Sequence, residues 1–466
     1  ILILAKLNIQ SSNKVIVCNF RRDQTGLVLT PYLEKGQVEA AKYRSRVMMM
    51  KQRVHSEAYS GYITVDKKHQ SNLFFLHILA KLAPKKAPLL LWLHGGPGKS
   101  ALFSQFLENG PLGISGMGML YRRRHTVQNF ANVIYLDQPP GAGFSYTKSP
   151  QGYAQSLQDS TAAISEFLRQ FLVMFPEYQN RQFFVAGESY GAGFVAKPIY
   201  LVHEVDRPVV TKYSRNAGCG IYYVHDSCFM IGSLVYKEEA KNRGNKGESQ
   251  MRKPKQKSGG VSVKLNPHNA IFFLFFACIS LISARASADL DTFVWSDGQS
   301  PLSSLHPFTI SCCYDRRYAQ RPIFKRSIHV TPTARLDGDR INVALNLGMK
   351  DYFTDISPLV QDVLDSQRVL VYSAQMDTVL PAVNLDKYFR SLNWTGAEQF
   401  REGSRQRWYS SGQKPPMLGY VRTVKDLTYV LLTRAGHHVS FDQTATVYKM
   451  IKFFVSDHDF LTSYEE

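Results

Sequence analysis

Short apolar runs separated by polar turns recur along the first part of this 466-residue chain. Residues 59–65 and 72–75 are rich in β-branched and aromatic side chains and flank the polar turn 66–70, which predicts two neighbouring strands. The runs 89–93 and 131–137 are almost continuously apolar. Such runs are typical of strands that helices cover on both faces.

A long amphipathic segment follows these strands. Apolar side chains between residues 154 and 175 repeat at helical spacing, and Pro176 predicts the end of that helix. The apolar run 183–186 then predicts another strand. Because strands and helices alternate, we expect an α/β fold with a doubly wound, mostly parallel sheet.

The same pattern returns in the C-terminal part. Residues 369–372 and 427–432 predict two more strands, and residues 448–455 predict an amphipathic helix. The middle of the chain lacks this regularity, so we expect an inserted, atypical cap region there. The predicted N-terminal extension, whose true start is missing, is 1–26. The predicted core has two parts, 27–200 and 336–466, and the insert between them is 201–335.

The predicted insert contains an unusual apolar run. Residues 237–268 are basic and polar, and residues 271–282 are apolar but shorter than the about 20 residues that span a bilayer. We therefore expect no stable membrane span. Basic residues before the run and Ala286-Ser287-Ala288 after it have the layout of a secretory signal peptide. Such a segment inside a chain favours a misassembled gene model, and the alternative is a buried helix of a cap domain.

The formal net charge of +19 raises the question of an anionic partner. The basic residues are concentrated in runs such as 122–124 and 237–264, which contain no interleaved recognition motif and are typical of solvated surface. We therefore expect no nucleic-acid partner. The cysteines have no C-x-x-C or zinc spacing, so no metal site is predicted, although disulfides remain compatible with them. They are Cys18, Cys219, Cys228, Cys278, Cys312 and Cys313.

The turn 187–191 has the sequence Gly-Glu-Ser-Tyr-Gly and follows the predicted strand 183–186 directly. This is the pattern of a nucleophile elbow, in which a tight strand-to-helix turn presents the serine hydroxyl above the sheet. Glycines flank the serine because the turn leaves no room for Cβ atoms there. A chance match is the alternative interpretation, since so short a pattern recurs in unrelated proteins.

A glycine-rich loop, residues 94–98, follows the strand 89–93. Its backbone N–H groups could approach a ligand closely, which suits an oxyanion hole. A phosphate-binding loop is the competing interpretation, because Gly98-Lys99-Ser100 resembles the end of that motif. The rest of the motif is missing, so we favour the oxyanion hole.

Ser189, Asp377 and His437 each follow a predicted strand. Functional groups in open α/β sheets gather outside the carboxyl ends of the strands, and the chain order Ser, Asp, His is that of the α/β-hydrolase triad. His437 would take the proton of Ser189, and Asp377 would orient the imidazole. Taken singly, the aspartate and the histidine could equally be ordinary turn residues. Together with the elbow and the glycine loop they predict a serine hydrolase.

These motifs resemble those of the serine carboxypeptidases, most closely the vitellogenic-like branch. The resemblance covers about residues 27–200 and 336–466. Its motifs are residues 29–32, 60–62, 91–98, 108–111, 137–139, 143–146, 187–191 and 435–437. It implies an α/β-hydrolase that releases C-terminal residues from peptides and proteins, without a cofactor, in a secreted or lysosomal/vacuolar setting.

The resemblance also implies roles for individual residues. The backbone N–H groups of Gly96 and Tyr190 would form the oxyanion hole. The terminal carboxylate of the substrate would be held by four residues: His94, Gly95, Glu108 and Glu188. Two glutamates can bind the substrate's carboxylate only if the three groups share protons, because their negative charges repel. We therefore expect an acidic working pH. Asn393 lies in a glycosylation sequon, Asn393-Trp394-Thr395.

Several positions depart from the family pattern. His94 stands where Asn or Gln is usual, Lys99 replaces a small residue or Cys, and Ala192 replaces a Gly. His438 replaces an apolar residue, so two adjacent rings compete for the role of base, and we favour His437 because it follows Gly436. Two alternatives to a carboxypeptidase therefore stay open. They are an esterase or lipase on the same fold, and a catalytically impaired hydrolase-fold protein that acts by binding.

Overall fold

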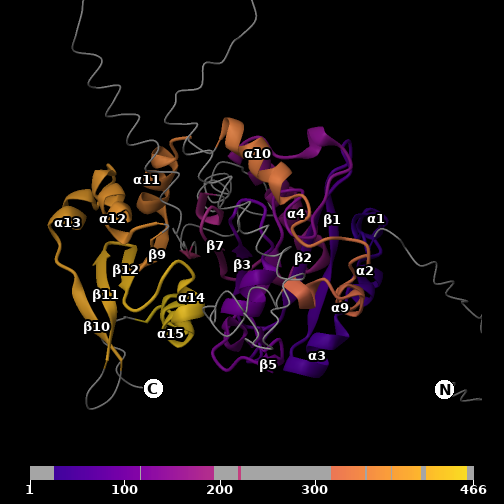
Figure 1. Cartoon of the computed structure of the whole chain (residues 1–466), viewed down its shortest axis with the longest axis horizontal. Coiled ribbons are helices and arrows are strands. Elements are labelled where there is room, and N and C mark those ends of the chain that lie inside the picture. The colour runs from indigo at the N-terminus through magenta and orange to yellow at the C-terminus, as the bar shows by residue number, and fades with distance from the viewer. Residues whose placement is uncertain are drawn as a thin grey trace, which may run out of the picture.

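A computed structural model describes residues 26–115, 117–193, 219–221, 316–351, 354–378, 380–410 and 416–458 (Figure 1). The predictions for residues 1–25, for the basic stretch 237–268 and for the apolar run 271–282 lie outside the described residues. So do all the cysteines except Cys219.

The first part of the core forms a five-stranded sheet whose strand order is β1-β2-β6-β3-β7. Its strands are β1 (Ala58–Asp66), β2 (Ser71–Ile78), β3 (Leu89–Leu93), β6 (Asn132–Leu136) and β7 (Phe183–Gly187). The pairs β6–β3 and β3–β7 are parallel, whereas β1–β2 and β2–β6 are antiparallel. The strands predicted at 89–93, 131–137 and 183–186 are confirmed to within a residue or two.

The second part of the core, together with β8 from the predicted insert, forms another five-stranded sheet, with the order β10-β11-β12-β9-β8. Its strands are β8 (Cys219–Ile221), β9 (Arg368–Ala374), β10 (Gln406–Tyr409), β11 (Met417–Val424) and β12 (Leu427–Leu432). The pairs β8–β9 and β9–β12 are parallel, and the outer pairs are antiparallel. Since β7 lies beside β8, the parallel strands of both sheets occupy the centre, and only the outer strands depart from the predicted parallel arrangement (Figure 1).

Helices cover both faces of the sheets. The predicted helix 154–175 is α4 (Leu157–Met174), which begins where the Ser156 hydroxyl accepts the backbone N–H of Asp159 and ends before Pro176. The predicted helix 448–455 is α15 (Thr444–Val455), which starts four residues earlier. The other α-helices in the described part of the chain are α1 (Thr30–Glu34), α2 (Val38–Arg44), α3 (Met48–Val54), α9 (Pro322–Ser327), α10 (Arg340–Lys350), α11 (Ser357–Ser366), α12 (Ala382–Ser391), α13 (Ala397–Glu402) and α14 (Val439–Asp442).

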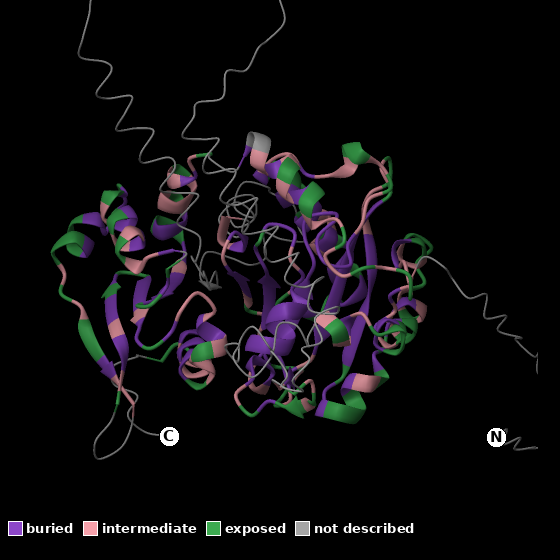
Figure 2. Cartoon of the chain, viewed as in Figure 1, coloured by how far each residue is buried: buried purple, intermediate pink, exposed green. Residues whose placement is uncertain are grey.

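Two apolar cores result, one on each face of the strands. Along β3, Leu91 belongs to the core that contains Phe167 of α4, and its neighbour Trp92 belongs to the core that contains Phe454 of α15. This alternation follows from the pleat, which turns successive side chains to opposite faces. Figure 2 shows buried residues concentrated on the strands and exposed residues on the outer helices. The strands therefore form a rigid frame whose loops can hold reactive groups.

Residues 316–335, within the predicted insert, pack against the first part of the core. The ring centroids of Tyr318 and Phe324 lie 5.7 and 5.4 Å from that of Phe106. Within the described part of the chain, no helix combines the length and apolarity needed to cross a membrane.

Candidate active site

Ser189 lies at the sharp turn after β7. Its φ of 58° is in the left-handed region, which non-glycine residues seldom adopt and which is characteristic of a strained functional turn. Gly191 is required by close packing, because a Cβ atom there would lie 2.6 Å from the carbonyl oxygen of Leu93. The side chain of Ser189 remains partly exposed, so a substrate could reach it. The turn thus has the geometry expected of a nucleophile elbow.

The loops after β9 and β12 place Asp377 beside His437. These strands are parallel neighbours, and their pairing continues beyond the strand ends, where the backbone N–H of Met376 donates to the carbonyl of Ala435 over 3.0 Å. His437 Nδ1 lies 3.2 and 3.3 Å from the two carboxylate oxygens of Asp377. Asp377 is buried and also accepts the backbone N–H of Leu380 over 2.9 Å. The carboxylate is therefore fixed and can orient the imidazole.

The predicted oxyanion loop lies directly against the elbow. A Cβ atom on Gly95 would be 2.5 Å from the backbone nitrogen of Tyr190, so only glycine allows this approach. Gly96 has a φ of 113°, and its N–H has no hydrogen-bond acceptor among the described residues. The loop that carries Gly95 and Gly96 therefore lies against the turn that carries Ser189 and Tyr190.

Asp137, for which the sequence motifs indicate no separate role, anchors the segment after this loop. Its buried carboxylate accepts the Ser100 hydroxyl over 2.7 Å and the backbone N–H groups of Ala101 and Phe144, each over 2.8 Å. Burial raises the pKa of Asp137 to about 7 in spite of these hydrogen bonds. Its position directly after β6 was the signal that could have identified it.

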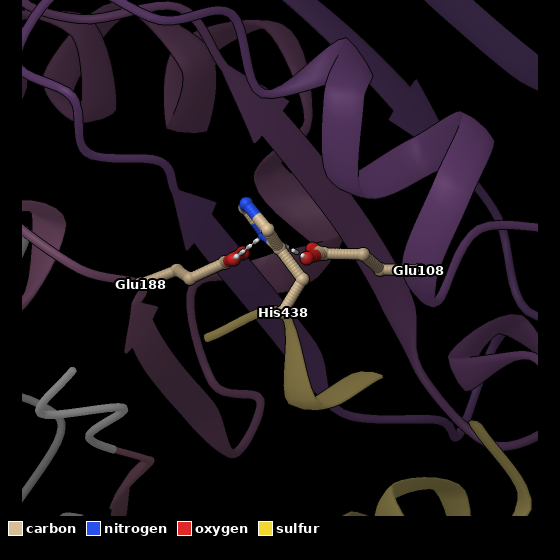
Figure 3. A group of neighbouring side chains, drawn as sticks. All are labelled: Glu108, Glu188 and His438. Carbon is tan, nitrogen blue, oxygen red and sulfur yellow. Dashed lines mark hydrogen bonds and ion pairs between the residues drawn. The ribbon is translucent and has the colours of Figure 1, made fainter. Parts of the chain in front are cut away.

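Glu108 and Glu188 face each other in the interior, 1% and 3% exposed (Figure 3). Burial and the charge of Glu188 raise the pKa of Glu108 to about 7. Burial also opposes ionisation of Glu188, but His94 and hydrogen bonds from His438, His94 and Glu108 outweigh it and hold the pKa of Glu188 well below its usual range. Glu108 is therefore the acid that keeps a proton, and Glu188 is the acid that loses it.

His94 lies against this pair. Its Nδ1 is 3.4 Å from Glu188 Oε2, and its ring stacks on Phe103 with a centroid distance of 5.2 Å. Among the described residues, its Nε2 makes no hydrogen bond. Burial lowers the pKa of His94. Buried polar groups are rarely left without a partner, so Nε2 is available to a ligand.

His438, the competitor for the role of base, faces the acids instead of Asp377. Its Nδ1 lies 3.4 Å from Glu108 Oε1 and 3.6 Å from Glu188 Oε1, between the two carboxylates (Figure 3). The ligand atoms of these three residues lie within 4.8 Å of one another. A cation could bind to these three residues, but protons shared among the carboxylates and the imidazole satisfy the same ligand atoms. We therefore interpret the cluster as a proton-sharing group.

Glu108 lies on η1 (Ser104–Glu108), which is a π-helical turn. The buried Arg123 holds the end of this turn by donating to the carbonyls of Gln105, Phe106 and Gly110. The expectation that the run 122–124 is solvated surface is therefore wrong for Arg123, although Arg122 and Arg124 are exposed.

The Arg123→Met variant should lower the free energy of unfolding by about 3 kcal/mol or more, because several buried carbonyls lose their donor. Denaturant unfolding measures this change. The matched control is Arg124→Met at the adjacent exposed position, for which we expect a change within about 0.5 kcal/mol. Equal, small effects of both substitutions would contradict the assigned role of Arg123.

Comparisons with known proteins identify the family that this chain resembles. The model of the serine carboxypeptidase family matches residues 49–208 and 278–457. Human CPVL, named a probable serine carboxypeptidase, is 28% identical over 436 residues, which cover 92% of this chain and 89% of that protein. A vitellogenic carboxypeptidase from Aedes aegypti is 29% identical over 445 residues, with coverage of 92% and 89%.

A venom serine carboxypeptidase from Apis mellifera is 28% identical over 443 residues, with coverage of 93% of this chain and 91% of that protein. Among solved structures, Kex1, a prohormone-processing carboxypeptidase from Saccharomyces cerevisiae, matches with a TM-score of 0.62 at 16% identity, covering 86% of this chain and 92% of that one. The predicted α/β-hydrolase fold is confirmed by the family match and this structural similarity.

Proposed function

The chain belongs to the serine carboxypeptidase family, and we propose from this premise that it removes C-terminal residues from peptides and proteins at acidic pH through Ser189, His437 and Asp377. The observation that carries the proposal is the buried pair of acids beside the nucleophile, since Glu188 immediately precedes Ser189 and faces Glu108 (Figure 3). A general esterase has no need for two acids at this place.

In the proposed mechanism, Ser189 attacks the carbonyl of the last peptide bond and His437 accepts its proton. Asp377 holds His437 Nδ1, which leaves Nε2 for the serine and stabilises the imidazolium that forms. The backbone N–H groups of Gly96 and Tyr190 would stabilise the oxyanion. His437 then gives its proton to the leaving amine, and water hydrolyses the acyl-enzyme by the reverse sequence.

The substrate's terminal carboxylate would be held by Glu108, Glu188, His94 and the backbone of Gly95. A protonated Glu108 can donate a hydrogen bond, and its Oε2 has no partner among the described residues. The Nε2 of His94, which has no partner among the described residues, offers a further donor when it carries the ring proton. These groups select a free carboxylate because an amide at that position would bring no negative charge to share the proton.

The Glu108→Gln variant should retain cleavage of a peptide acid to higher pH than the wild type. In the wild type, Glu108 is protonated below its pKa of about 7, so carboxylate binding is present there and is lost as the pH rises through that value. Glutamine keeps an N–H donor at every pH. The measurement is kcat/KM against pH for a blocked dipeptide acid and for its amide.

The matched control is Glu177→Gln, at an exposed glutamate paired with Lys42, which should leave the profile unchanged. An unshifted decline in Glu108→Gln would remove Glu108 from the carboxylate site. Equal cleavage of acid and amide across the acidic range would overturn the carboxypeptidase proposal and favour the esterase.

A secreted or lysosomal location would suit the proposed acidic optimum. One relative is named a venom protein, which supports secretion of this chain. Asn393 is exposed between α12 and α13, where its side chain is open to glycosylation. We infer that Asn393 carries a glycan if the protein enters the secretory route.

A further inference from the structure

His438 is the residue of the site that the proposed mechanism leaves unused. It is adjacent to His437 in sequence, yet its ring is turned to a different set of partners, with Nδ1 between Glu108 and Glu188 (Figure 3). The two imidazole rings are 5.2 Å apart and nearly perpendicular. The His437 ring therefore contacts Asp377, and the His438 ring contacts Glu108 and Glu188.

We propose that His438 is a further substrate-binding residue, whose imidazolium supplies the positive charge that lets Glu108 and Glu188 accept a C-terminal carboxylate. This inference rests on the proposed function and deepens it. It identifies which group offsets the third negative charge when the substrate enters. Peptides with a free terminal carboxylate are the substrate class that it selects.

Charge balance at the site favours this role. The substrate would bring a third carboxylate next to Glu108 and Glu188, and the three acids together must take up protons or find a cation to limit their repulsion. A protonated His438 is a charge-assisted donor within reach of both acids. With His438 protonated, the site needs one proton fewer to bind the same carboxylate.

The surroundings of His438 both raise and lower its pKa. Burial and the nearby Lys99 disfavour its protonated form, but hydrogen bonds to Glu108 and Glu188 outweigh them and raise the pKa of His438. Lys99 Nζ lies over the Phe103 ring, 3.1 Å from its centroid, and the same ring lies 5.0 Å from that of His438. The other titratable groups near the cluster are His94, His437, Tyr372 and Arg123.

The effect of His438 should depend on pH. At acidic pH Glu108 carries a proton of its own and can bind the carboxylate without help. As the pH rises and Glu108 begins to ionise, the imidazolium becomes the main source of compensation, and its contribution disappears when His438 itself loses its proton. The largest effect is therefore expected near neutral pH, between these two limits.

The test compares wild type, His438→Leu and His438→Gln on a matched peptide acid and peptide amide across pH. In His438→Leu the acid-to-amide ratio of kcat/KM should fall about ten- to hundredfold near neutral pH, the range expected for a hydrogen bond to a charged group, and less at acidic pH. For His438→Gln, which keeps a donor without a charge, the acid-to-amide ratio should lie between those of the wild type and of His438→Leu. His69→Leu is the matched control, because it removes a histidine that is paired with the carboxylate of Asp66 and makes no contact with Glu108 or Glu188 among the described residues.

A second measurement needs no catalysis. In a Ser189→Ala background, calorimetry in buffers of different ionisation heat counts the protons taken up when the peptide acid binds. Replacing His438 with leucine should weaken acid binding near neutral pH and increase the proton uptake per peptide.

The outcomes separate this inference from the proposed function. If the wild type prefers the acid and His438→Leu keeps that preference with unchanged proton uptake, only the role of His438 is overturned. Equal losses for acid and amide would show a purely structural role and would also overturn it. If the wild type itself cleaves acid and amide alike, the proposed function and this inference fail together.

Discussion

The Ser189→Ala variant is expected to lose peptide hydrolysis by about 10⁴- to 10⁶-fold while it keeps its fold. The substitution removes the hydroxyl that attacks the substrate. Alanine is smaller than serine, so the partly exposed turn can accept it. Single-turnover assays with a peptide acid measure the rate, and circular dichroism checks the fold. Labelling by a serine-directed fluorophosphonate should disappear in the same variant.

The matched control is Ser165→Ala on the exposed face of α4, which should change neither the rate nor the labelling. Substantial residual hydrolysis or labelling in Ser189→Ala would place the nucleophile elsewhere. Absence of labelling in the wild type would favour a protein that acts by binding.

His437→Ala should lose activity on the scale of Ser189→Ala, about 10⁴-fold or more, on peptide acids and amides alike. The reason is that His437 Nδ1 contacts Asp377, so this ring is held for proton transfer. The neighbouring substitution His438→Leu should lower chiefly the preference for acids. Steady-state kinetics with both substrates compares the two variants.

The two histidines would exchange roles if His438→Leu lost both activities and His437→Ala kept them. Equal losses would mean that neither ring has a separate task. A matched substitution outside the site, His69→Leu, controls for the loss of any histidine.

The strands were predictable because their apolar runs have a length and position that only a covered sheet explains. β3 and β12 coincide with the runs 89–93 and 427–432. The antiparallel pairing of the outer strands was harder to predict, since a single sequence does not reveal which neighbour a strand pairs with. Asp377 and His437 could be predicted as a pair because both follow strands, where α/β sheets gather functional groups, and the structure brings the two side chains together.

Other features depend on contacts that no local pattern reveals. The π-helical turn η1 differs from an α-helix by hydrogen bonds to the fifth residue, and a five-residue segment carries no periodicity that separates the two. Arg123 was hidden within a basic run that otherwise faces solvent. His438 is 330 positions from Glu108, so its pairing with that acid emerges only from the fold.

The most direct test of the central claim follows the products of a peptide with a free C-terminus and of its amidated twin by mass spectrometry at acidic pH. We predict stepwise loss of single residues from the C-terminus of the acid, far slower change of the amide, and no change of either with Ser189→Ala. Internal cleavage, equal rates for acid and amide, or hydrolysis of esters alone would contradict the assignment of this chain as a serine carboxypeptidase.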